Sequence, residues 1–316
     1  MTSLLDTIQK DQFYWICTHI NPDLDAVSSL LSLLYVLNNL GYQVAGKLEN
    51  EPEWMDFLFF WDLYKDLGKQ NNGDEYHVIA LDSGSKDRIW PGELIRNAKS
   101  IINIDHHYDN PLYGTYNICE TEASSTAELL FQLFTNDNIP LDRETASNLY
   151  AGILFDTGGF RYSNTKMGTL KTSLSLIQAG IHPSLISDYV FNRWDRQGFS
   201  ALQLALSSVE YWENGLILFS FVSHKELTDY HLSNSDFDGV IDILRLQRFT
   251  CFSILVREIE PGLFKGSVRA KEPYVIGDSI RVLGGGGHKR AAGFSVKMES
   301  IEEIKTILKN NMKALL

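Results

Sequence analysis

The chain has 316 residues, 44% of them hydrophobic and 22% charged, and a formal net charge of -12. This composition predicts a globular protein of about two domains. The negative charge argues against a protein that binds long nucleic acid, because that function requires a broad Lys/Arg surface. The three cysteines lie far apart, which predicts neither a disulfide framework nor a thiolate zinc site. Since no apolar stretch reaches the length of a membrane span, we expect a cytoplasmic protein without membrane contact.

The first half of the chain alternates between apolar runs and amphipathic segments. This alternation predicts an α/β domain with a parallel sheet and helices on both faces. The expected strands cover residues 14–18, 42–46, 77–81 and 101–104, and the expected helices cover 26–37 and 52–67.

The segments that follow have a helical pattern at first, and the later ones have the apolar pattern of strands. Ser125 and Glu128 form the pattern of a capping box, Asp142 or Thr145 is expected to open the next helix, and a further helix is expected over 166–179. The rest predicts a smaller α/β domain with a mixed sheet: strands at 216–222, 251–256, 264–270 and 292–296, then a helix from about 300. The expected domains are 1–187 and 211–316, joined by a helix or linker over 188–210.

Metal-binding side chains follow the first expected strand. His19 ends an apolar run, and Asp23 and Asp25 follow at the start of a helical segment. Because the two aspartates are two residues apart, the turn between them can direct them at two neighbouring cations. The alternative is that Asp25 only caps the helix and His19 is incidental.

Similar side chains follow the later segments. Asp82 comes directly after the strand at 77–81, Asp105, His106 and His107 follow the strand at 101–104, and Asp156 ends a helical run before two glycines. Each also has an ordinary structural explanation: Asp82 is typical of a turn, the two histidines of loop or core residues, and Asp156 of a helix C-terminus. Open α/β sheets, however, bind ligands outside the carboxyl ends of their strands, where these residues converge. Such an oxygen-rich set suits two octahedral cations about 3.5–4 Å apart, and this arrangement favours phosphoryl displacement.

A glycine-rich run, residues 282–294, stands in the second expected domain. Gly284, Gly285, Gly286 and Gly287 are successive, and His288, Lys289 and Arg290 follow them. Exposed glycine amides can bind an anion, although a flexible surface turn is the better explanation of the four glycines taken alone. Ser267 and Arg269 on the preceding expected strand favour phosphate binding. We therefore expect an active site in a cleft between a metal-binding domain and a phosphate-binding domain.

Together these motifs resemble the DHH phosphoesterase family, of the nanoRNase/pAp phosphatase (NrnA) type with a DHH-associated C-terminal domain. The likeness spans nearly the whole chain. It rests on His-Ile-Asn-Pro-Asp-Leu-Asp-Ala (19–26), Asp82, Asp-His-His (105–107), Asp-Thr-Gly-Gly-Phe (156–160) and the glycine-rich run. Leu24 and Ser28 depart from glycines that are common in the family.

The resemblance implies two Mn(II) ions, with Mg(II) or Co(II) as substitutes. One ion would be bound by His19, Asp23 and Asp82, and the other by Asp25, Asp82, His106 and Asp156. Asp105 would support the site, and His107 would contact the scissile phosphate or assist the leaving group. Substrate phosphates would be bound by Ser267, Arg269, the glycines 284–287 and His288, and Arg193 is added from its position alone.

The implied activity is hydrolysis of very short oligoribonucleotides to 5'-mononucleotides, with pAp as a further substrate. Alternatives are a pApA phosphodiesterase in cyclic di-AMP turnover, a pyrophosphatase or exopolyphosphatase-like hydrolase, and a nucleotide-binding sensor without activity. A homodimer stays open.

Overall fold

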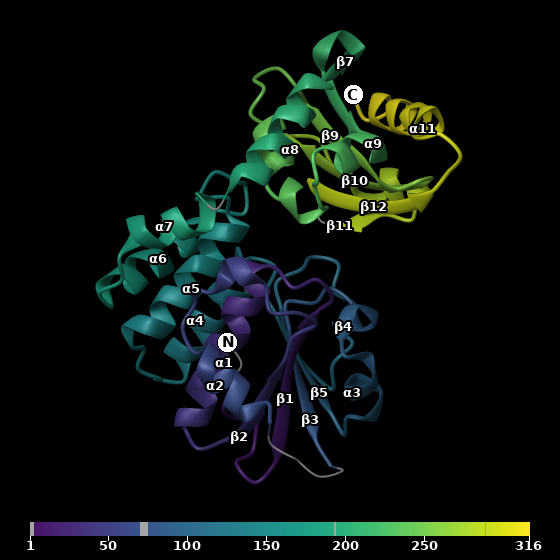
Figure 1. Cartoon of the computed structure of the whole chain (residues 1–316). Coiled ribbons are helices and arrows are strands. Elements are labelled where there is room, and N and C mark those ends of the chain that lie inside the picture. Colours follow the sequence, from purple (N-terminus) through teal and green to yellow (C-terminus); the bar gives the residue numbers. More distant parts are fainter. Residues whose placement is uncertain (1–2, 70–74, 193, 288) are drawn as a thin grey trace. The chain divides into compact units, whose positions relative to one another are not determined.

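The computed structural model describes residues 3–69, 75–192, 194–287 and 289–316. The chain forms two compact units, Met1–Arg193 and Trp194–Leu316. The boundary between the units falls inside the segment 188–210 that was expected to connect two domains. Each unit is described by itself (Figure 1).

The first unit is built on a parallel sheet. Its strands lie in the order β2-β1-β3-β5-β6, and short β4 pairs with β1 in the antiparallel sense. All four strands expected in this part of the chain are confirmed, while β4 and β6 were not expected. The bounds are β1 Phe13–His19, β2 Gln43–Lys47, β3 His77–Leu81, β4 Ile89–Trp90, β5 Ile101–Asp105 and β6 Tyr116–Cys119.

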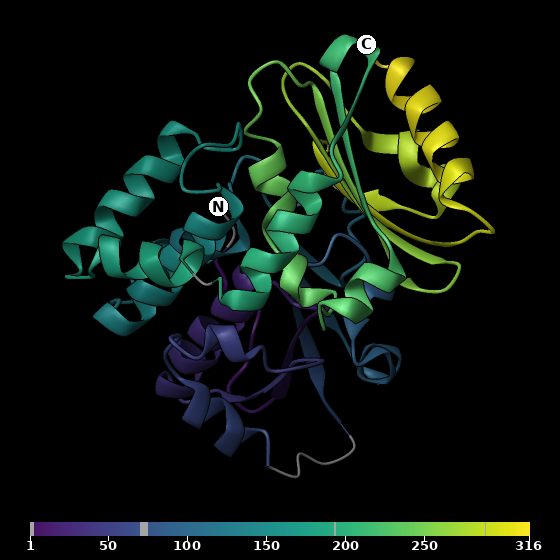
Figure 2. The same ribbon diagram turned by 45° about the horizontal axis from the view of Figure 1, so that its top comes forward.

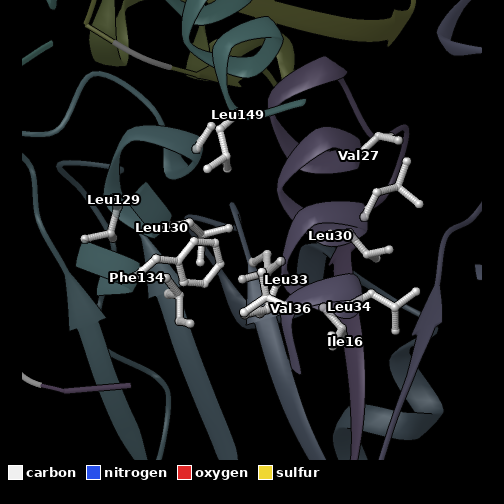
Figure 3. Close-up of a cluster of buried hydrophobic side chains, with 14 of the residues drawn as sticks. Ile16, Val27, Leu30, Leu33, Leu34, Val36, Leu129, Leu130, Phe134 and Leu149 are labelled. Atoms are coloured by element: carbon white, nitrogen blue, oxygen red, sulfur yellow. The ribbon is translucent and has the colours of Figure 1, made fainter. Parts of the chain in front are cut away.

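Helices cover both faces of this sheet, as the sequence predicts. On one face, Ile16 of β1 packs in a large core with α1 (Leu24–Asn39), α4 (Thr126–Asn136) and α5 (Arg143–Asp156), part of which Figure 3 shows. On the other face, Trp15 packs in a smaller cluster with Ile95 of α3 (Gly92–Asn97), which follows the one-turn helix η2 (Lys86–Arg88). Residues that alternate along β1 therefore enter different cores, as the two-residue period of a strand requires.

The order of the strands reverses at β1. The chain passes from β1 to β2 on one side and then returns to β3 on the other side. In open α/β sheets, such a reversal leaves a gap at the carboxyl ends of the two strands, where ligands bind. His19 and Asp82 stand at these two ends.

The prediction of one continuous helix over residues 52–67 is wrong. The structure has a single 3-10 turn, Glu53–Met55, and then α2, Trp61–Leu67. Between them, Phe60 has a left-handed backbone with φ 78°. The side chain of Asn148 on α5 accepts from the Phe59 N–H at 2.9 Å and donates to its carbonyl at 3.1 Å, so tertiary hydrogen bonds replace helical ones.

Helix caps agree with the sequence in part. Ser125 accepts from the Glu128 N–H at 3.0 Å and Asp142 caps α5, as expected. The reciprocal arm of the capping box is not formed, because the Glu128 carboxylate accepts instead from the N–H and hydroxyl of Ser124. The helices α6 (Met167–Gln178) and α7 (Pro183–Phe191) complete the first unit.

The second unit has a mixed sheet in the order β11-β12-β10-β9-β8-β7. Strands β8 and β9 are parallel, and the other neighbours are antiparallel. Helix α11 packs on one face, and α8, α9 and α10 carry a second core on the other (Figure 2). The strands are β7 Glu210–Trp212, β8 Ile217–Val222, β9 Phe252–Glu260, β10 Leu263–Ala270, β11 Gly286–Gly287 and β12 Ala291–Lys297. The helices are α8 Arg196–Ser207, η3 Glu213–Gly215, α9 His224–Asp229, η4 Ser235–Phe237, α10 Val240–Leu244, η5 Gly277–Leu283 and α11 Ile301–Lys313.

Within the residues described, none of the helices combines the length and the apolar character that crossing a membrane requires.

Candidate metal centre

The first motif brings a histidine and two aspartates to the junction of β1 and α1. His19 is the last residue of β1, and its Nδ1 donates to the carbonyl of Ile20 at 2.9 Å, which turns Nε2 toward Asp82. Asp23 caps α1 by accepting from the Ala26 N–H at 3.1 Å. Asp25 lies inside the first turn of α1 and is fully buried. The capping alternative thus applies to Asp23 rather than to Asp25.

Asp82 lies between the two groups of candidate ligands. One carboxylate oxygen is 3.7 Å from His19 Nε2, and the other is 3.4 Å from His106 Nε2. The residue follows β3 with φ 54°, a left-handed backbone that aspartate adopts more readily than most residues. This turn presents the carboxylate at the carboxyl end of β3.

The Asp-His-His run divides its side chains between two tasks. Asp105, fully buried, accepts from the His106 N–H at 2.9 Å and from His107 Nδ1 at 2.6 Å. His106 Nε2 lies 3.2 Å from Asp156. Because Asp105 fixes the His107 ring through Nδ1, it orients that ring. Gly84 leaves space for the ring, since a Cβ there would stand 3.3 Å from it.

Asp156 reaches the site from the end of α5. It is the last helical residue, and Gly158 and Gly159 follow with φ 57° and 70°. A Cβ at Gly158 would lie 2.4 Å from the Tyr162 ring, so this turn requires glycine. The segment is therefore a helix C-terminus and also a part of the site.

The sequence analysis missed Thr126, which contacts two candidate ligands. Its hydroxyl donates to Asp82 at 3.0 Å, and its N–H donates to Asp25 at 2.7 Å. The Ala127 N–H donates to the other oxygen of Asp25 at 2.9 Å. Asp25 therefore binds the N-terminus of α4, where unpaired amides and the helix dipole favour a carboxylate. The sequence predicted a helix start at Ser125, and this was the signal that could have pointed to Thr126.

Asn110 is a second residue that the sequence analysis missed. Its side-chain amide donates to Asp105 and to the carbonyl of Ser83 at 3.3 Å. Asn103, buried on β5, donates to the Asn110 side chain at 3.0 Å. Asn110 thus joins the loop that follows β3 to the loop that follows β5.

Burial and mutual repulsion hold protons on this site. Burial, then the charges of Asp82 and Asp23, raises the pKa of Asp25 well above its usual value. Burial and the charge of Asp25 do the same to the pKa of Asp156. Burial alone would lower the pKa of His19, but its hydrogen bond to Asp82 and the charge of Asp23 raise that pKa to about 9.

The pKa of Asp82 is shifted in the opposite direction. Burial works against its charge, yet hydrogen bonds from His106 and His19 hold its pKa well below the usual range. Burial also opposes the charge on His107, but Asp105 raises the pKa of this ring through a hydrogen bond and its own charge. The site therefore combines an ionised central carboxylate with protons held around it.

Three groups of these side chains each have ligand atoms within 4.8 Å of one another. They are His19, Asp23 and Asp82; Asp25, His106 and Asp156; and Asp82, His106 and His107. Carboxylate oxygens with imidazole nitrogens suit divalent cations with octahedral geometry. The donor set therefore fits divalent cations, although it does not name the metal.

In the second unit, the structure brings several predicted phosphate-binding residues into one row. Ser267 on β10 pairs with Gly293 on β12, which pairs with Gly286 on β11. Arg269, on the same face of β10 as Ser267, donates through Nε to Asp242 at 3.2 Å. The row is open, since Ser267 is only partly buried and both glycines are exposed.

The glycine run is partly explained by packing. The Gly284 and Gly285 amides donate to the carbonyls of Arg281 and Ile280, at 2.9 and 3.2 Å, so neither is available to an anion in this conformation. A Cβ at Gly287 would lie 2.4 Å from the carbonyl of Ala291. The predicted nest of four free amides is therefore not formed, and substrate binding by this run stays a prediction. Arg193 and His288 lie outside the described residues.

The fold and the site define a two-unit α/β phosphoesterase. Residues 14–153 match the DHH family, N-terminal domain, and residues 219–314 match the DHHA1 domain. The chain belongs to the DHH family of metal-dependent phosphoesterases.

Curated relatives are similar over most of the chain. A protein of Thermus thermophilus named "Bifunctional oligoribonuclease and PAP phosphatase NrnA" is 30% identical over 90% of this chain and 84% of its own length. The protein of the same name from Bacillus subtilis is 27% identical over 93% of both chains. The structure of an exopolyphosphatase-related protein from Bacteroides fragilis superimposes with a TM-score of 0.83 at 23% identity, covering 96% of this chain and 92% of that one. The last likeness confirms the expected two-unit fold.

Proposed function

We propose that this protein hydrolyses very short oligoribonucleotides to 5'-mononucleotides and also removes phosphate from pAp. The position of Asp82 carries the proposal: its two oxygens face His19 and His106, one in each candidate metal group. The names of the Thermus and Bacillus relatives support this choice of substrates. The net charge of -12 favours a substrate with few phosphates.

The proposed ligands are His19, Asp23 and Asp82 for one cation, and Asp25, Asp82, His106 and Asp156 for the other, with Mn(II) as the favoured metal. Two divalent cations in these positions would activate water and offset charge on the reacting phosphate. Asp105 holds the His107 proton at Nδ1, so the opposite ring nitrogen, Nε2, is oriented away from Asp105. We assign to that nitrogen the contact with the scissile phosphate or the leaving group.

In the second unit, Ser267, Arg269 and the exposed Gly286 are the proposed contacts to a further phosphate. Arg269 is held by Asp242 in a partly exposed position, which pre-orients a guanidinium for phosphate. The predicted cytoplasmic location belongs to the same proposal. It is supported by the free thiols of Cys17, Cys119 and Cys251, which suit a reducing compartment.

The proposal is tested by a panel of initial rates in Mn(II). The substrates are pAp, pApA, a five-residue RNA, a long RNA, cyclic di-AMP and pyrophosphate, and Asp82→Ala is the inactive control. We expect the five-residue RNA, pApA and pAp to be hydrolysed fastest. Preference for long RNA or pyrophosphate, or binding of pAp without hydrolysis, would contradict the proposal.

A further inference from the structure

Arg257 is a buried cation in the second unit. It lies on β9 and is only 4% exposed, although arginine is almost never fully buried unless it is paired. The ring of Phe237, which is itself buried, lies 5.4 Å from the guanidinium carbon and covers the side chain. Burying such a charge costs free energy unless a partner of opposite charge offsets the cost.

The hydrogen bonds of this guanidinium are few and long. Its Nη1 donates to the carbonyl of Asn234 at 3.3 Å, and its Nη2 donates to the hydroxyl of Ser267 at 3.5 Å. Its Nε is buried and has no hydrogen-bond partner among the described residues. Both acceptors are neutral, and a guanidinium has five N–H donors. Burial lowers the pKa of Arg257 to about 10 against the charge of Asp238, so the side chain keeps its positive charge at neutral pH.

This charge lies beside the open row that contains Ser267. Strands β9 and β10 are neighbours in the second unit (Figure 1), and Arg257 pairs with Lys265 in their register. Ser267, two residues further along β10, is therefore the diagonal neighbour of Arg257 on the same face of the sheet. Lys265 and Arg269 flank Ser267 on this face, since alternate residues of a strand point the same way. Basic side chains thus surround one partly exposed hydroxyl.

We infer that Arg257 is a positioning residue that makes this row selective for a terminal phosphate, a monoester, over an internal phosphodiester. The inference rests on the proposed function and names the part of the substrate that the row binds. Because the Ser267 hydroxyl accepts from Arg257, its own hydrogen is left to be donated to a phosphate oxygen. The bound phosphate then supplies, across a single hydroxyl, the negative charge that the buried guanidinium lacks.

The selectivity follows from the charge of the ligand. A phosphate monoester carries about -1.5 to -2 charges near neutral pH, whereas each internal phosphate of a nucleic acid carries one. The attraction between two charges grows with their product, and it is stronger where protein excludes water. Arg257 therefore favours the phosphorylated end of a short oligonucleotide, or pAp, over an internal position of a long RNA.

NMR titration of the full chain with two small probes tests the inference. The probes are methyl phosphate, a monoester, and dimethyl phosphate, a diester, at pH 8 in EDTA, so that divalent cations do not contribute. The wild type is expected to bind methyl phosphate at least about tenfold more tightly than dimethyl phosphate. Arg257→Met should weaken the binding of methyl phosphate at least about tenfold and lose the preference.

The matched control is Arg248→Met, which removes an exposed arginine of the same unit and should bind both probes as the wild type does. The wild type also gives a measurement that needs no functional variant. Its Arg257 Nε–H signal, identified by its absence in Arg257→Met, should shift as methyl phosphate is added. An unmoved signal, a wild type without preference, or an Arg257→Met chain with wild-type affinity would overturn the inference.

The melting temperature separates this role from a purely structural one. Methionine fills a similar space without a charge, so Arg257→Met should melt at the wild-type temperature or above it when no anion is present. If Arg257 only holds the Asn234 carbonyl in place, the variant should instead melt at a lower temperature and bind methyl phosphate normally.

The result can be separated from that of the proposed function. Binding of methyl phosphate that depends on Arg257 supports the inference even if the panel of rates shows no hydrolysis of RNA. Hydrolysis of short RNA by Arg257→Met with the wild-type KM contradicts the inference and leaves the proposed function standing.

Discussion

The hydroxyl of Thr126 donates to Asp82 at 3.0 Å, while the N–H of the same residue donates to Asp25 at 2.7 Å. One residue at the N-terminus of α4 thus positions two carboxylates that come from different elements. Mutation of residues that hold metal ligands by hydrogen bonds typically lowers metal affinity or activity by about 10- to 100-fold. Thr126 is therefore a positioning residue in the proposed centre.

Replacing Thr126 with valine should weaken the centre while retaining the fold. Thr126→Val keeps the shape and the backbone N–H but removes the hydroxyl that orients Asp82. We expect Mn(II) affinity and kcat each to fall by about 10- to 100-fold. Isothermal titration with Mn(II) measures the first quantity and steady-state kinetics the second. Thr126→Ser restores the hydroxyl and should recover most of both, whereas equal losses in the two variants would contradict this role.

Gly152 on α5 lets α1 and α4 pack closely against α5 beside the site. A Cβ there would stand 2.6 Å from Ser28 Oγ and 2.7 Å from Asp25 Oδ1. Gly152→Ala should therefore lower the free energy of unfolding by about 1–3 kcal/mol, the usual cost of overpacking, and displace Asp25. Urea denaturation and Mn(II) titration measure the two effects. Gly198→Ala on α8 is the control, because its Cβ would meet nothing closer than 3.4 Å; equal stability of both variants would refute the packing argument.

The strands and the sites after them could be predicted because their signals are local. The apolar run 77–81 became β3 without any shift, and Asp82 follows it as expected. Other features depend on contacts between distant parts of the chain. Asn148 breaks the expected helix near Phe59, 89 residues earlier, and Thr126 reaches Asp25 across 101 residues. Propensity and periodicity do not describe such tertiary hydrogen bonds.

The departures from the family pattern also have a structural explanation. Leu24, between the two aspartates, is fully buried in the core of the first unit. The Ser28 hydroxyl donates to the carbonyl of Asp25 at 3.2 Å and lies beside Gly152. Leu24 and Ser28, which stand where the family commonly has glycine, therefore pack inward. They leave the carboxylates of Asp23 and Asp25 in place.

The pH profile should reveal the dependence of His107 on Asp105. The hydrogen bond and the charge of Asp105 raise the pKa of His107 against the effect of burial. Asp105→Asn removes the charge, so the high-pH limb of kcat/KM, where His107 loses its proton, should move to lower pH. Asn110→Ala, which keeps the Asp105 carboxylate, should leave that limb near its wild-type position. If activity is too low, NMR titration of His107 gives the same shift, and an unmoved limb or titration would contradict the pairing.

Metal binding should release protons from the site. The raised pKa values of Asp25 and Asp156, and the His19 pKa of about 9, mean that the metal-free site carries protons near neutral pH. Ligands must lose those protons before they bind a cation, so Mn(II) affinity should rise as the pH rises toward 9. Calorimetry in buffers with different ionisation enthalpies counts the released protons. Heats that do not depend on the buffer would show that the ligands are already deprotonated.

Arg269 should affect substrate binding more than the chemical step. It stands on β10 beside the open row of Ser267 and Gly286, and Asp242 holds its guanidinium at 3.2 Å. If it binds a phosphate away from the reacting bond, Arg269→Ala should raise KM for short RNA about tenfold or more with little change in kcat, since charged hydrogen bonds are worth about 1.5–3 kcal/mol.

The Arg269 experiment has an exposed arginine for comparison. Arg248→Ala removes an equal charge from the surface of the same unit and should leave KM unchanged. Arg269→Lys keeps the charge but loses the planar pair of donors, so its KM should fall between those of the wild type and the alanine variant. If the phosphate that Arg269 binds is the 5'-phosphate of the substrate, removing this phosphate should raise KM by a larger factor for the wild type than for Arg269→Ala. The variant has already lost the contact with it. If both proteins lose the same factor, Arg269 does not bind that phosphate.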